Sequence, residues 1–149
     1  MRDLLLLDQL SELVQKIRSG GQTKELLDQL RELKSKTEGE GQTEELPDQL
    51  HELVTKLILE SMKNDYIANE QEDIHREAMK IRERLVQLRQ KQFDQNTEGY
   101  KEATEALGVV NNNLQTALNR INNLTEFFGN TARLVAALDK LIQARVSAV

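Results

Sequence analysis

Apolar residues recur along the first part of the chain at spacings of three and four, the pattern of amphipathic helices. One short motif occurs three times at intervals of twenty residues, as Leu7–Leu13, Leu27–Leu33 and Pro47–Leu53. Every copy contains Asp-Gln-Leu and ends in Glu-Leu. Glycine-containing segments at 19–21 and 38–41 separate the copies and would end the helices there. We therefore predict two short helices in residues 1–45, and a third copy that continues into a longer helix.

The ends of the repeat helices also carry signals. Thr23 and Thr43 stand where a side-chain hydroxyl would accept a free backbone N–H at a helix start. Pro47 fits a helix only in the first turn, where its missing N–H costs nothing. Helices this short are marginal alone in water, so we expect them to pack on other elements.

From Leu50 onward the apolar positions follow the alternating three-and-four spacing of a coiled coil. The pattern predicts a first long helix over 46–93, a tip loop over 94–99 and a second long helix over 100–149. A short loop makes neighbouring helices antiparallel. The expected fold is all-α: a long antiparallel helical hairpin (coiled coil), with the two short N-terminal helices completing a four-helix cluster at the end that holds the termini. We expect one domain overall.

Antiparallel pairing of the two long helices admits more than one register. The preferred register sets Leu85 beside Val110 and Ala78 beside Ala117, and it places Asn64 opposite Thr131 in a polar layer. Such a layer fixes register at a cost in stability. An alternative, displaced by one heptad, scatters the polar residues. Gly129 stands where the four-helix cluster would begin and predicts a kink or a helix break.

Composition and charge narrow the function classes. The chain has no Cys, so disulfides, thiol chemistry and zinc–cysteine sites are excluded. Its net charge of -5 disfavours a general nucleic-acid binder, and we expect no nucleic-acid partner. No apolar stretch is long enough for a transmembrane helix or a signal peptide, so we expect a cytoplasmic protein.

Two sequence motifs suggest metal chemistry, and one segment is basic. Glu72-Asp73-Ile74-His75 and Asp48-Gln49-Leu50-His51 have the spacing of ligands on one helical face. A di-iron site would need a second such motif on the other long helix, and that helix has none. We therefore expect no metal or cofactor and place His75 on solvated surface beside the seam. The basic segment contains Lys80, Arg82, Arg84, Arg89 and Lys91, and we interpret it as a solvated helix flank.

No motif of nucleophilic catalysis or phosphate binding is present, so we expect a protein that is not an enzyme. The favoured hypothesis is a structural or adaptor protein that binds protein partners and forms a homodimer or higher oligomer through helix–helix contacts. Apolar positions beside the seams are candidate interaction residues: Ile58, Met62, Tyr66, Val109 and Leu118. Phe127 and Phe128, where the apolar face of the second long helix widens, are further candidates and would act in the membrane alternative. One alternative is a membrane-acting effector that inserts its C-terminal amphipathic helix; a metal-binding helical bundle is another.

Overall fold

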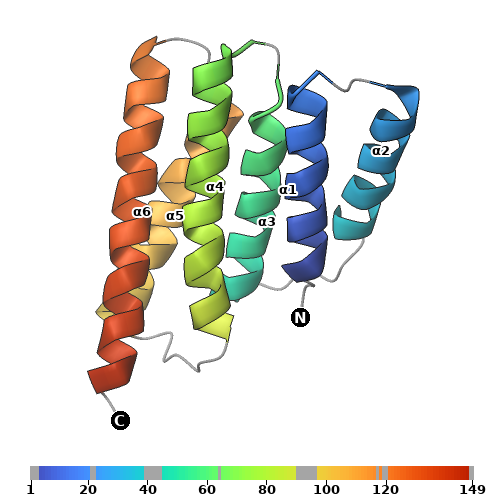
Figure 1. Ribbon diagram of the computed structural model, residues 1–149. Coiled ribbons are helices and arrows are strands. Elements are labelled where there is room, and N and C mark those ends of the chain that lie inside the picture. Colours follow the sequence, from blue (N-terminus) through green and yellow to red (C-terminus); the bar gives the residue numbers. More distant parts are fainter. Residues whose placement is uncertain are drawn as a thin grey trace. The chain divides into compact units, whose positions relative to one another are not determined.

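The computed structural model describes residues 4–20, 23–38, 45–63, 65–89, 97–116, 118 and 121–147. These residues form six helices and no strand, which confirms the predicted all-α class (Figure 1). The helices are α1 (Leu4–Arg18), α2 (Lys24–Glu38), α3 (Leu46–Glu60), α4 (Ala68–Arg89), α5 (Glu98–Gln115) and α6 (Ile121–Ser147).

The contacts group the chain into two compact units, Met1–Met79 and Lys80–Val149, where the sequence predicted one domain. The boundary falls inside α4, so the first half of this helix belongs to one unit and the second half to the other.

In the first unit α1 lies between α2 and α3 and packs on both (Figure 1). The three helices correspond to the three sequence repeats, and each is 15 residues long. The repeat spacing puts its leucines on one face of each helix. In α1 and α3 this face is buried, whereas Leu30 and Thr37 are the buried residues of the described part of α2. The helix α2 is therefore the least covered of the three.

The predicted helix ends of this unit are largely confirmed. The α1 helix stops at Ser19–Gly20, where the N–H of Gly20 donates to Ile17 O and its φ of +103° lies in the region that favours glycine. The hydroxyl oxygen of Thr23 accepts from the N–H of Leu26 at 3.2 Å and caps α2. Pro47 lies in the first turn of α3. Thr43 lies outside the described residues.

The prediction of one long helix over 46–93 is wrong, because α3 ends at Glu60 and α4 begins at Ala68. After Glu60 the backbone hydrogen bonds connect residues three positions apart instead of four: Met62 N–H donates to Leu59 O, and Lys63 N–H donates to Glu60 O. The hydroxyl of Ser61 donates to Ile58 O at 2.6 Å and competes with the helical ladder.

Side chains around this turn hold the new chain direction. The phenol of Tyr66 donates to Glu60 Oε1 at 2.6 Å, and Lys63 forms an ion pair with the same carboxylate at 2.8 Å. Burial and the bond to Glu60 raise the pKa of Tyr66. The carboxylate of Glu70 then accepts from the N–H of Ile67 and satisfies a free donor at the start of α4. Glu60 thus stabilises the turn that ends α3.

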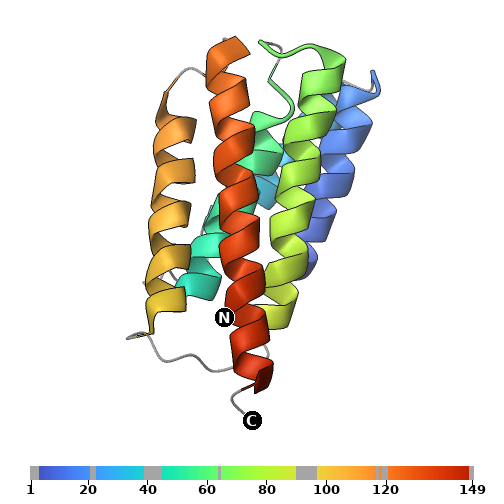
Figure 2. The ribbon, with the colours of Figure 1, turned by 90° about the vertical axis from the view of Figure 1, so that its left-hand side faces the viewer.

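In the second unit α5 and α6 pack side by side and run antiparallel (Figure 2). Their buried residues recur every three or four positions, as in Ala103, Leu107 and Val110 of α5. A polar bond also joins the two helices, since the amide of Asn130 donates to Asn113 Oδ1 at 2.6 Å. The second half of α4 is joined to α6 by Arg84, whose Nε donates to Asp139 Oδ1 at 3.0 Å.

The prediction of one long helix over 100–149 is also wrong. The α5 helix ends at Gln115, and Thr116 adopts an extended conformation with φ -99° and ψ 164°. The Thr116 hydroxyl donates to Asn113 O and replaces a helical bond there. Gly129, where a kink or break was expected, lies exposed inside a continuous α6. The break lies between Gln115 and Ile121, before the start of the helix that contains Gly129.

Because of these two breaks, the helices α3, α4, α5 and α6 occupy the part of the chain that was predicted to form a hairpin of two long helices. Helices α4 and α5 flank the expected tip at 94–99, but residues 90–96 lie outside the described part, as does Asn64 of the expected polar layer. The hydroxyl of Thr131, the other member of that layer, donates within its own helix to Phe128 O. The four-helix cluster joins elements of both units and stays a prediction.

The N-cap of α5 gives a direct stability prediction. The Thr97 hydroxyl accepts from the N–H of Tyr100 at 3.3 Å, so Thr97→Ala should lower the free energy of unfolding by about 1 kcal/mol. Urea unfolding followed by circular dichroism would measure it. Thr104→Ala is the matched control, because Thr104 is exposed in the same helix and bonds only its own helical turn. Equal losses in both variants would contradict the capping role.

Candidate functional site

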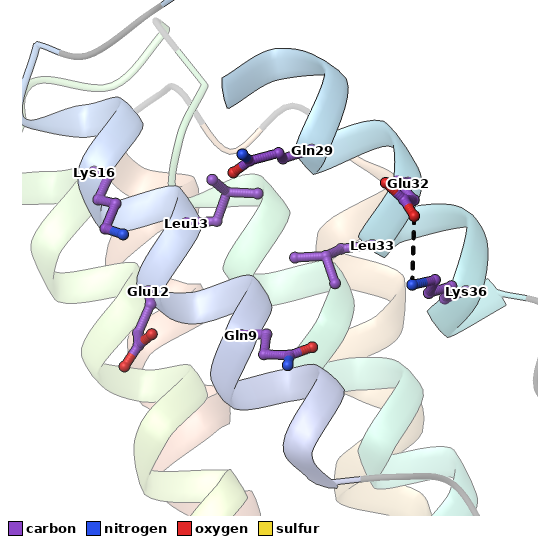
Figure 3. A pocket seen from close by; sticks show the side chains of 8 residues that line it. All are labelled: Gln9, Glu12, Leu13, Lys16, Gln29, Glu32, Leu33 and Lys36. Carbon is purple, nitrogen blue, oxygen red and sulfur yellow. Dashed lines mark ion pairs between the residues drawn. The ribbon is translucent and has the colours of Figure 1, made fainter. Parts of the chain in front are cut away.

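A groove runs between α1 and α2 in the first unit, and its walls come from the sequence repeat. It has a volume of about 310 Å³ and is lined by four residues of each helix: Gln9, Glu12, Leu13, Lys16, Gln29, Glu32, Leu33 and Lys36 (Figure 3). Each of the four lining residues on α1 has a counterpart of the same type twenty positions later on α2. Because the two helices are antiparallel, the groove has an approximate two-fold axis across it.

The groove has an apolar floor and a charged rim. Leu13 and Leu33 point from their helices into the space between them (Figure 3). Leu13 is buried, whereas Leu33 is partly exposed. On α2, Lys36 forms an ion pair with Glu32 at 3.4 Å, one helical turn away. Along each wall an acidic side chain is therefore followed by a basic one after four residues.

The third repeat uses the equivalent positions differently. Leu53 on α3 corresponds to Leu13 and Leu33, and it is fully buried. Lys56 and Glu52 still form the ion pair of that turn, at 3.4 Å. The leucine at this motif position thus belongs to the core in α3 and to an open groove between α1 and α2.

A buried polar cluster joins α1 to α4 in the same unit. Ser11 Oγ lies 2.7 Å from His75 Nε2, and the Ser11 hydroxyl also faces Met79 Sδ at 3.8 Å. His75 is 4% exposed, so the prediction that it lies on solvated surface is wrong. It adjoins the core residue Ile74, and the bond to Ser11 satisfies its Nε2 inside the protein.

Burial and charge decide the protonation state of His75. Burial is the larger cause that lowers its pKa from 6.5 to about 4, and the positive charge of Arg18 acts in the same direction. Burial also lowers the pKa of Arg18, against the opposing effect of Glu72. His75 is therefore neutral at physiological pH, and a proton on it would be buried near a second cation.

The Ser11–His75 contact has the distance of a nucleophile and its base, but its surroundings favour a structural role. A catalytic histidine needs an acceptor on Nδ1 to leave Nε2 free as the base. Among the described residues Nδ1 of His75 has no such partner. The nearby pocket, about 400 Å³ and bordered by Arg18 and Glu72, is lined by neither Ser11 nor His75. This arrangement favours a neutral histidine that donates from Nε2 to Ser11.

The two predicted metal motifs are not brought together with further ligands. Within the described residues no three His, Cys, Asp or Glu side chains are placed to hold a metal ion. His51, like His75, is buried, at 1% exposed. In the basic segment Arg84 bonds Asp139, so one of its cations has a partner inside the chain.

The predicted interaction residues fall into two groups. Ile58, Tyr66, Leu118 and Phe127 are buried by the chain itself. Met62 and Phe128 are half-buried, and Val109 is 42% exposed. Val109 borders a pocket of about 230 Å³ between α5 and α6, together with Glu102, Glu105, Ala106, Asn130 and Arg133.

The repeat-lined groove was not among the predicted interaction sites. Its signal was present in the sequence, because Gln, Glu, Leu and Lys recur at the same offsets in the first two copies. The heptad pattern marks apolar positions alone, so it does not indicate these mixed polar and apolar positions.

None of the described helices is both long and apolar enough to cross a membrane. Comparison with known proteins found no matching family model, curated protein or solved structure.

Proposed function

We propose that this chain is a non-enzymatic structural or adaptor protein that works through helix–helix contacts, with self-association as one of them. The observation that carries the proposal is the groove between α1 and α2, which is open at its rim although its floor is apolar. Burial of apolar area is the main favourable term in protein association, and charged rims add specificity.

The state of α2 supports the same proposal. This helix packs on α1, yet Leu26 and Leu33 are only half-buried and Leu27 is 40% exposed. A 15-residue helix with so little buried surface gains stability when a further helix covers it. The buried Ser11–His75 pair is accounted for as a contact between helices, so it calls for no catalytic role.

Self-association has a direct test. At increasing protein concentration, light scattering should report a mass that rises from 17.1 kDa toward twice that value. A mass that stays at the monomer value up to the highest soluble concentration would contradict self-association. Liposome leakage measured on the same samples would instead favour the membrane alternative.

A further inference from the structure

We infer that the groove between α1 and α2 is a two-fold interface that binds the same groove of a second copy of this chain. The inference rests on the proposed function and names both its surface and its partner. The occupant follows from the symmetry of the lining, since four residue types occur in equivalent places on two antiparallel helices.

The charges of the rim are complementary to themselves. In a two-fold interface, when a residue of the first copy contacts a different residue of the second copy, the same pair is also in contact with the two copies exchanged. Each wall carries an acidic residue and then a basic one four positions later, as Glu12 with Lys16 and Glu32 with Lys36. When a second groove faces the first with its helices antiparallel, glutamates lie opposite lysines. Four antiparallel helices would then enclose Leu13 and Leu33 of both copies.

Leu5 extends this surface along α1. It precedes Gln9 by four residues and Leu13 by eight, so it lies on the groove side of the helix. Its side chain is 58% exposed, which leaves a large apolar group beside the polar rim. A second copy covering the groove would remove Leu5 from water, whereas a small polar ligand would leave it exposed.

A filled equivalent exists within the chain. The third repeat presents Gln49, Glu52, Leu53 and Lys56 at the same offsets, and there Leu53 is fully buried. The leucine at this position of the motif is therefore compatible with a closed helical core when a further helix covers it.

Charge reversal with complementation tests the inference. One variant combines Glu12→Lys with Glu32→Lys, and the other combines Lys16→Glu with Lys36→Glu. All four side chains are exposed, so the fold should persist, as circular dichroism would show. Each variant alone places like charges across the interface, and we expect a dimer about tenfold weaker or more by analytical ultracentrifugation. Mixing the two variants should restore association as a heterodimer.

The matched controls are Glu52→Lys and Lys56→Glu, which reverse the same motif positions on α3, outside the groove. They should leave the dimer affinity unchanged. A wild-type chain that is monomeric at all concentrations would overturn both this inference and self-association. A wild-type dimer that both groove variants leave intact would overturn the groove interface alone. Loss of association without rescue in the mixture would also overturn the two-fold pairing, and would point to a head-to-tail contact between the groove and a different surface of the second copy.

Discussion

Phe127→Ala should lower the free energy of unfolding by about 3–5 kcal/mol, as large-to-small changes of fully buried aromatics do. Phe127 is 0% exposed and is the largest fully buried side chain among the described residues. Its ring also contacts that of Phe128, with centroids 5.4 Å apart and planes tilted by 58°. Removing it loses the transfer free energy of the ring and leaves a cavity. Urea unfolding monitored by circular dichroism would measure the loss.

Phe128→Ala is the matched control for this experiment. Phe128 is the same residue type, one position away on α6, but only half-buried. It should cost clearly less than Phe127, because less apolar area leaves water when it packs. Equal small losses would contradict Phe127 as a core residue, and would return it to the interaction surface that the sequence predicted.

Acidification should destabilise the protein through His75, by up to about 3 kcal/mol between pH 6.5 and pH 4. The pKa of His75 is lowered to about 4 in the folded chain from 6.5. The unfolded chain therefore binds the proton more readily throughout this interval, and stability falls as the pH drops. Burial near Arg18 is the physical reason, because a protonated imidazole would lie buried beside another cation.

The comparison of wild type with His75→Gln isolates this effect from the carboxylates that titrate in the same range. Urea unfolding at pH 7 and at pH 4.5 gives the loss for each protein. The variant lacks the ionisable ring, so its loss on acidification should be smaller by about 2 kcal/mol. Equal losses would show that His75 titrates at the same pH in the folded and unfolded chains.

The sequence predicted the helical class and the short repeat helices correctly, because both follow from local spacing and caps. Thr23 and Pro47 stand at helix starts for reasons that involve only their own backbone groups. The two helix breaks were missed since the three-and-four spacing continues across them. Glu60 and Asn64 are two successive polar residues on the seam, and Gln71 is a third after Ile67; this interruption of the apolar pattern indicated the first break. Thr116 follows an asparagine run without any Gly or Pro, so the second break had a much weaker signal.

The site was harder to predict than the fold. Whether an apolar residue such as Ile58 or Leu118 is free for a partner depends on which neighbours cover it, and periodicity does not specify them. His75 shows the same limit, because it is buried and its partner Ser11 lies in another helix far along the sequence. The residues that line the groove could have been predicted from the sequence, because they repeat at a constant offset of twenty positions.

The three repeats also create competition during folding. Helices α2 and α3 carry nearly the same motif and both pack on α1, so a nascent chain can dock either one first. Several equivalent positions distinguish them: α2 has the exposed residues Arg31 and Lys34 where α3 has the buried residues His51 and Val54. Burial of a charged side chain such as the Lys34 ammonium costs free energy, so α2 is disfavoured in the position that α3 occupies. A few polar side chains outside the shared motif therefore determine which of two similar helices is covered by the core.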